Sequence, residues 1–370
     1  MSDKTETVEE AAGETGLSQR LYGALSRFEG PHTIGTSDRF WLGFLIVVAT
    51  ILSYPMLASE FGVLTTTTLF VWVFLSLSLS ICWGYAGIFS FGQTAFFGLG
   101  GYTFGVVGIN LLPVTGGTNL ALLAAILVPA LGAAAVGYFM FYGRVSGVYV
   151  AIITLAVTLI LELLFSRTAG AEYAIGSAQL GGYNGMTGIP DLTLGAGPVV
   201  IELDTMGTFY FVVGLLIVMY LALRYVLNSN YGYLMVATRE SEDRTETLGY
   251  DVRLLKLQVF TVAGGVAGLG GALYASTGNF ISPPIMGLAF AALPVIWITV
   301  GGRKTLIGAI LGTLAVRGLS NRLASAGSEL AVIFVGLLLL ASVLLLPEGA
   351  VPTINQYLQQ RFAPDKGEQP

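Results

Sequence analysis

Long apolar stretches, separated by short polar segments, make up most of this chain. A helix needs about 20 apolar residues to cross a lipid bilayer, and the apolar windows predict about ten candidate spans. They are Phe40–Ser59, Gly62–Trp83, Ala86–Ile109, Asn119–Phe141, Val148–Phe165, Met206–Leu227, Leu257–Gly278, Leu288–Val300, Leu306–Ser320 and Leu330–Leu346. The pattern predicts an all-α fold, a polytopic transmembrane helical bundle over residues 40–350, between an N-terminal tail (1–39) and a C-terminal tail (351–370).

Two of these spans depart from a regular helical pattern. Ala86–Ile109 is rich in glycine, and the short span Leu288–Val300 contains Pro294. Because irregular helices at membrane depth often line cavities, both are expected to be glycine-broken or re-entrant helices. The tetrapeptide GLGG occurs at Gly98–Gly101 and again at Gly268–Gly271. Small residues let membrane helices approach closely, so these segments predict close packing, with two related halves as the alternative.

The N-terminal tail is polar and acid-rich over its first 39 residues, and it shows no pattern of a cleaved signal peptide. Leu17, Leu21 and Leu25 recur at helical spacing. This spacing predicts an amphipathic helix over residues 17–28 that lies in the membrane interface, with a partly ordered tail as the alternative.

One strongly charged segment, Gly232–Val252, interrupts the apolar spans. Within it, Ala237–Leu248 predicts a short helix that begins at Thr238. Charges of both signs alternate there, and Glu240 and Arg244 have the (i, i+4) spacing of a helical ion pair. An exposed helix of this kind suits docking in a cleft of a partner protein. A solvated helix that only joins two spans is the alternative.

Basic residues orient the spans, since cytoplasmic loops carry an excess of Lys and Arg. If the N-terminus is in the cytoplasm, Arg167 and Arg322 are the only basic loop residues on the external side of the membrane. The loop over residues 166–205 holds one basic residue and several acidic ones, which suits an external loop. Both termini and the loop over residues 228–252 are therefore expected on the cytoplasmic side of the cell membrane. The inside set is Lys4, Arg20, Arg27, Arg39, Arg144, Arg224, Arg239, Arg244, Arg253, Lys256, Arg303, Lys304, Arg361 and Lys366.

Composition excludes several classes of protein. The chain is 54% hydrophobic and 11% charged, with a mean hydropathy of +0.77, so the lipid bilayer is its expected surrounding. A net charge of −5 argues against nucleic acid as a partner. The sequence shows no phosphate-binding loop, no metal-ligand spacing and no group of nucleophile, base and orienting residue. We therefore expect no enzyme activity, no catalytic residues, no metal site and no cofactor, and we expect other chains to bind any ATP.

Neutral polar residues inside the spans are candidates for lining a translocation path: Ser90, Gln93, Thr94, Tyr149 and Thr154. Gln93 is the strongest of them, while serine and threonine often bond their own helix's carbonyls instead. Ionisable residues within the spans are scarce, with Glu162 and Arg317 as the examples. Because secondary transporters usually need such groups, the scarcity favours a neutral or zwitterionic solute moved by energy supplied elsewhere. A passive channel fits the same pattern.

Three segments together resemble a known family. WGYAGIFSFGQTAFFGLGGYT (Trp83–Thr103), GGYNGMTGIP (Gly181–Pro190) and the segment Arg239–Ala275 are similar to the permease subunits of ABC importers for branched-chain amino acids and urea. The similarity covers roughly Leu64–Val351. RVSGVYVAIITLAVT (Arg144–Thr158) is among the segments that lean to the urea branch. Urea-type permeases, however, usually carry a histidine where Gln93 stands.

The resemblance implies a permease subunit that forms half of the path for urea or a branched-chain amino acid. The charged segment would couple to a cytoplasmic ATPase subunit through Arg239, Glu240, Arg244, Leu248 and Gly249. The implied partners are a homologous second permease subunit, two cytoplasmic ATP-binding subunits and an external solute-binding protein. A self-sufficient channel or facilitator for a small neutral solute, and a secondary transporter, are the alternatives.

Overall fold

A computed structural model describes residues 28–35, 38–196 and 199–325, together with residues 336, 337, 340, 344, 346 and 348–362. The predicted interfacial helix lies outside the described residues except for its last residue, Phe28. Most of the predicted span Leu330–Leu346 also lies outside them.

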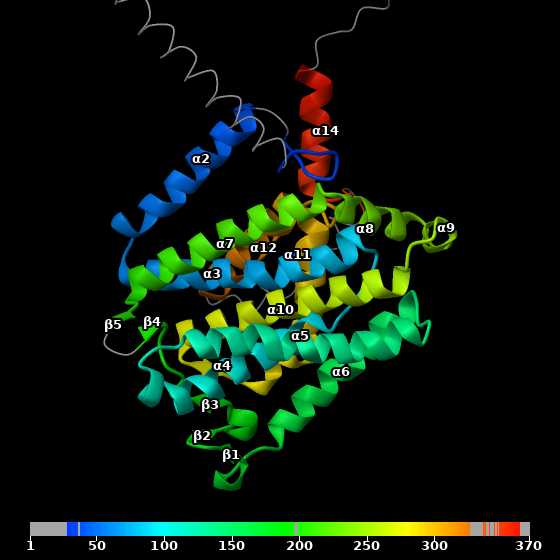
Figure 1. Ribbon diagram of the computed structural model, residues 1–370. Helices are drawn as coiled ribbons and strands as arrows, with labels where there is room; N and C mark the ends of the chain where they lie inside the picture. Colours follow the sequence, from blue (N-terminus) through cyan, green and yellow to red (C-terminus); the bar gives the residue numbers. More distant parts are fainter. Residues whose placement is uncertain are drawn as a thin grey trace, which may run out of the picture.

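Helices account for most of the described chain (Figure 1). Six of them are long and apolar enough to cross a membrane: α3 with the π-helical turn that extends it, α4, α5, α6, α7 and α10. The multi-pass helical fold predicted from the sequence is thereby confirmed. The helices are α2 (Asp38–Ser53), α3 (Glu60–Leu79), α4 (Gln93–Thr115), α5 (Asn119–Tyr142), α6 (Val148–Ser166), α7 (Thr205–Leu227), α8 (Asn230–Glu240), α9 (Glu242–Thr247), α10 (Val252–Gly278), α11 (Leu288–Gly301), α12 (Leu306–Ser325) and α14 (Ala350–Phe362).

The eighth and ninth predicted spans form one broken unit. The chain bends by 116° between α11 and α12, across residues 302–305, as in a broken span or a re-entrant loop. Gly302 at the break has a φ of +122°, which side chains rarely tolerate. Pro294 lies inside α11, which is continuous, and the bend follows the helix at residues 302–305. The expected irregularity is therefore present, but it lies after the proline.

The third predicted span, Ala86–Ile109, starts with an irregular segment and becomes helical only in its later part. Residues Ser80–Tyr85 extend α3 as a π-helical turn, and residues 86–92 form no helix. Helix α4 begins only at Gln93 and ends at Thr115. Gly87, with a φ of +74°, lies in the irregular segment. Gln93 therefore occupies a helix start, whereas the sequence placed it inside a span.

Helix α10 is at the centre of the bundle and packs against α3, α4 and α5. The two GLGG segments lie on α4 and α10 and face each other. A Cβ atom added at Gly100 would overlap backbone atoms of Gly268, and one added at Gly271 would overlap the carbonyl oxygen of Phe97. Close packing of these glycines, predicted from the sequence, is confirmed, and only glycine allows the two backbones to approach this closely.

Three small antiparallel sheets lie at the end of the bundle opposite to α8 and α9 (Figure 1). They pair β1 (Ala174–Ile175) with β2 (Ala178–Gln179), β4 (Thr193–Ala196) with β5 (Val199–Glu202), and β3 (Met186–Thr187) with β6 (Phe280–Ile281). The last pairing joins the 166–205 loop to the end of α10. Asn279 strengthens this junction, because its amide nitrogen donates to Ile189 O at 2.9 Å and Asp191 Oδ1 at 2.8 Å.

Candidate functional site

The charged segment folds as two helices, α8 and α9, and not as the single helix predicted from Thr238. Ser241 separates them with an extended backbone (φ −161°, ψ 107°), and its hydroxyl accepts a hydrogen bond from the Arg244 amide at 3.4 Å. Serine favours this N-capping position because its side chain replaces a missing helical acceptor. Thr238 is buried inside α8. The predicted start of the helix was therefore wrong.

Arg239 connects α8 to the π-helical turn after α3. Its Nη1 atom donates to the carbonyl oxygen of Gly84. Its Nε and Nη2 atoms donate to Oε1 of Glu240 at 3.0 Å and 2.7 Å. This hydrogen bonding, and the positive charge of Arg239, lower the pKa of the Glu240 carboxyl. The expected pair between Glu240 and Arg244 is thus replaced by a pair with the neighbouring residue.

The break between α11 and α12 reaches the same π-helical turn. Ser80 Oγ donates to the carbonyl oxygen of Arg303 at 3.3 Å, and the Arg303 guanidinium lies 5.0 Å from the ring centre of Trp83. A Cβ atom at Gly84 would overlap that same carbonyl oxygen. Three irregular backbone segments therefore meet here: the junction of α8 and α9, the π-helical turn, and the α11–α12 break.

The remaining coupling candidates lie on the surface. Arg244 is exposed, and the Leu248 side chain is 76% exposed. Gly249 follows with a φ of +91° and open space around it. Lys256 on α10 forms an ion pair with Glu242, which holds α9 against the bundle. Helix α9 is thus fixed to the bundle at its start, and it exposes mixed charges and the apolar side chain of Leu248 at its end.

Four of the predicted path residues come together around the irregular segment 86–92, and all four are buried. Gln93 Oε1 accepts from Ser78 Oγ at 2.8 Å, and Thr154 Oγ1 accepts from the Phe91 amide at 3.1 Å. Ser90 Oγ accepts from the Gly92 amide at 3.0 Å, and Thr94 Oγ1 donates to Phe91 O at 3.4 Å. Their polar atoms thus hold the irregular backbone in place. In this conformation they line no open path.

Tyr149 does not join this group. Its side chain is 71% exposed, near the start of α6, whereas Thr154 on the same helix is buried. The structure therefore separates Tyr149 from the other four candidates.

Sequence reasoning missed the importance of Arg224, which it counted only as a basic residue on the cytoplasmic side. Arg224 is completely buried near the end of α7. Its guanidinium donates to the carbonyl oxygens of Phe28, Ile34 and Gly35. The rings of Phe40 and Trp41 lie 4.4 Å and 5.0 Å from its central carbon. An arginine inside a predicted apolar span was the available signal, since such a residue needs polar partners.

The segment over residues 28–35, held by Arg224, also reaches helix α8. The His32 ring lies 4.6 Å from the ring of Tyr233 on α8, and the Tyr85 hydroxyl donates to the His32 carbonyl oxygen at 3.3 Å. Burial, and then the nearby positive charge of Arg239, lower the pKa of His32 below its usual value of 6.5. The N-terminal segment is thus one more element packed near the junction of α8 and α9.

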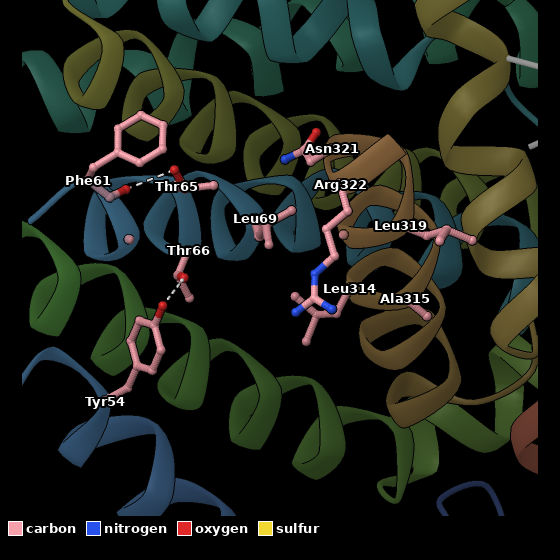
Figure 2. Close-up of a pocket in the computed structure, with 12 residues that line it drawn as sticks. Tyr54, Phe61, Thr65, Thr66, Leu69, Leu314, Ala315, Leu319, Asn321 and Arg322 are labelled. Atoms are coloured by element: carbon pink, nitrogen blue, oxygen red, sulfur yellow. Dashed lines mark hydrogen bonds between the residues drawn. The ribbon is translucent and has the colours of Figure 1, made fainter. Parts of the chain in front are cut away.

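A cavity of about 560 Å³ lies between α3 and α12 at the opposite end of the bundle (Figure 2). Its polar lining comprises Tyr54, Thr65, Thr66, Asn321 and Arg322. Its apolar lining includes Phe61, Leu69, Leu314 and Leu319. Glu60, at the start of α3, accepts a hydrogen bond from Thr205 Oγ1 at 3.1 Å. The cavity is therefore at the same end as the 166–205 loop.

Comparison with known proteins identifies similar chains. The family model described as "Branched-chain amino acid transport system / permease component" matches residues 62–343. The high-affinity branched-chain amino acid transport system permease protein LivM of Escherichia coli (strain K12) is 26% identical over 358 residues, which cover 90% of this chain and 79% of that protein. The probable branched-chain amino acid transport permease protein LivM of Methanocaldococcus jannaschii is 24% identical over 270 residues, covering 65% and 74%. No solved structure matches the chain.

Proposed function

This chain belongs to the family of branched-chain amino acid transport system permease components, and from that premise we propose that it forms half of the path of an ABC importer. The family consists of transport permeases, so the chain is a multi-pass membrane permease and not an enzyme. In the proposal, ATP is bound by separate cytoplasmic subunits, and this chain converts their movement into opening and closing of the path.

One set of contacts is the main support for the proposed coupling to an ATPase subunit. Arg239 joins α8 to the π-helical turn of α3, and the same turn contacts the break between α11 and α12. A displacement of α8 and α9 by an ATPase subunit would therefore act directly on two discontinuous helices. Discontinuous helices are the elements that line solute sites in many transporters. The exposed Leu248, Arg244 and Glu240 supply the apolar and charged surface that an ATPase cleft would receive.

The proposed solute is a branched-chain amino acid. The relatives described above are named for transport of these amino acids, whereas the lean towards the urea branch rests on sequence segments such as Arg144–Thr158. Gln93, where urea-type permeases usually carry a histidine, also fits the amino acid better. Urea is therefore the competing solute that the experiment must include.

The proposed assembly contains a homologous second permease subunit, two ATP-binding subunits and an external solute-binding protein. In the proposed orientation, both termini and the helices α8 and α9 face the cytoplasm, and the 166–205 loop with its small sheets faces outward. Loop charges support this orientation, because the 166–205 loop has one basic residue, Arg167. The strands lie at the end of the bundle opposite to α8 and α9, as the orientation requires (Figure 1).

Reconstitution tests the proposal. The complete set of subunits, placed in proteoliposomes, is expected to accumulate radiolabelled leucine only with ATP and with the binding protein present, and urea much less. Accumulation by this chain without ATPase subunits would show a facilitator instead. A variant that reverses the charges of both Glu240 and Arg244 is expected to lose bound ATPase subunits while its helical content is unchanged. Co-purification equal to the unmodified protein would contradict the coupling role.

A further inference from the structure

Arg322 lines the outer cavity without a protein partner among the described residues. Figure 2 shows its side chain extending from α12 into the space beside α3, where the two threonines of the lining lie. A guanidinium carries five N–H donors in a planar fork that matches a carboxylate. The Arg322 side chain is exposed, so an anion that enters the cavity can reach its guanidinium.

The other lining residues suit the remaining parts of an amino acid. Thr66 Oγ1 donates to the Tyr54 hydroxyl at 3.2 Å, which leaves the Tyr54 proton free to donate to a second oxygen of a carboxylate. Asn321 offers an amide oxygen that can accept from an ammonium group. Leu69 and Leu314 provide an aliphatic surface. The volume of about 560 Å³ lies within the range of about 300–1,000 Å³ usual for small-molecule sites.

A second arginine lies deeper on the same helix. Arg317 precedes Arg322 by five residues, a rise of about 7.5 Å along α12. Its Nε atom is buried without a hydrogen-bond partner, as is Nε1 of Trp72, whose ring lies 5.1 Å from the Arg317 guanidinium. One turn further in, Thr313 Oγ1 donates to Ser76 Oγ at 2.6 Å and ties α12 to α3. Arg317 is thus buried between this contact and the cavity, and it does not itself line the cavity.

We propose that this cavity is a binding site for a zwitterionic aliphatic amino acid, with the carboxylate on Arg322, the ammonium group at Asn321 and the side chain against Leu69 and Leu314. The inference rests on the proposed function and names the residues that hold its solute. It also separates the two candidate solutes, because urea has no carboxylate for Arg322 to bind.

Equilibrium binding to the complete transporter in vesicles tests this assignment. Radiolabelled leucine is the probe, and leucinamide, in which a neutral amide replaces the carboxylate, is the competitor. We expect Arg322→Gln to weaken leucine binding at least about tenfold and to abolish the preference for leucine over leucinamide, since a hydrogen bond to a charged group is lost. Arg322→Lys should retain part of the preference. Arg167→Gln is the matched control: it removes another exposed basic residue of the same end and should leave binding unchanged.

Three results would overturn the assignment. Unchanged leucine affinity in Arg322→Gln would show that the cavity does not bind the carboxylate. Loss of the second permease subunit from that variant would identify a partner chain as the occupant. Disappearance of the effect in vesicles without anionic lipid would identify a lipid headgroup. ATP-driven leucine uptake by the unmodified transporter in the same vesicles distinguishes failure of the proposed function from failure of the cavity site. If this uptake is absent, the proposed function is overturned. If it is present and Arg322→Gln binds leucine with unchanged affinity, only the cavity site is overturned.

Discussion

Arg239 donates a hydrogen bond to the carbonyl oxygen of Gly84, a residue 155 positions earlier in the chain. The bond joins the end of α8 to a π-helical turn, and π-helical turns are frequent at functional sites. Gly87 allows the approach, because a Cβ atom there would lie 3.1 Å from the Cγ atom of Arg239. The pair is the most direct connection between the charged segment and the broken helices.

Arg239→Ala is expected to uncouple transport from ATP hydrolysis. The charged hydrogen bond to Gly84 is lost, at a cost of about 1.5–3 kcal/mol to this contact. The stimulation of ATPase activity by solute-loaded binding protein should fall severalfold, while ATPase subunits remain bound. Arg253→Ala, which removes another basic side chain at the same end of the bundle but no bond to Gly84, is the control and should retain the stimulation. Equal losses in the two variants would show that positive charge at this end matters instead.

Gly84→Ala tests the contact between the π-helical turn and the α11–α12 break. The added methyl group would overlap the carbonyl oxygen of Arg303, and overpacking of this kind costs about 1–3 kcal/mol. We expect a lower melting temperature of the purified transporter and little uptake. Gly214→Ala is the matched control, since an added Cβ atom on α7 meets nothing within 4 Å. Wild-type melting and uptake in Gly84→Ala would show that the turn adjusts freely.

Thr154→Val distinguishes a structural from a path-lining role of the buried polar residues. Valine has nearly the shape of threonine but cannot accept the hydrogen bond of the Phe91 amide. An unpaired buried donor costs about 1–3 kcal/mol, so thermal stability should fall, and Thr154→Ser should restore it. The leucine concentration for half-maximal uptake should stay the same. A change in that concentration, with stability unaltered, would support the original interpretation that Thr154 lines the path.

The sequence predicted the helices well because an apolar stretch of membrane-spanning length leaves few alternatives. It could not predict where helices break. Ser80–Tyr85 continues an apolar pattern and resembles the end of a span, and its hydrogen-bond partners Arg303 and Arg239 are distant in sequence. Arg224 was misjudged for the same reason, since its partners are backbone carbonyls of residues 28–35, which no side-chain pattern reveals.

For the candidate site, residue type was a better guide than local pattern. Gln93 was singled out as the strongest candidate to line the path, and that role stays a prediction; its partners are Ser78 on α3 and Cys82 in the π-helical turn, which no local pattern reveals. The pair predicted between Glu240 and Arg244 assumed a continuous helix, and the N-cap at Ser241 removes that assumption. Helical spacing is informative only where the helix is continuous.

His32 gives the contact between the N-terminal segment and α8 a dependence on pH. Burial and Arg239 lower the pKa of His32 while residues 28–35 are packed against α8. When the segment is released, His32 binds a proton at about its usual pKa of 6.5. Above that pH both states are neutral and packing is at full strength; as the pH falls below it, packing weakens. Tyr233 and Tyr85 also face His32.

Amide hydrogen exchange of residues 28–35, corrected for its intrinsic pH dependence, measures this packing. Protection should decrease between about pH 7.5 and about pH 5.5, where an unperturbed histidine becomes protonated. His32→Gln keeps a polar side chain of similar reach without the titration, and its protection should be independent of pH over this interval. An unmodified protein whose protection stays constant, or rises as the pH falls, would show that His32 does not control the segment. Because Arg239 contributes to the lowered pKa, Arg239→Ala should also reduce the pH dependence.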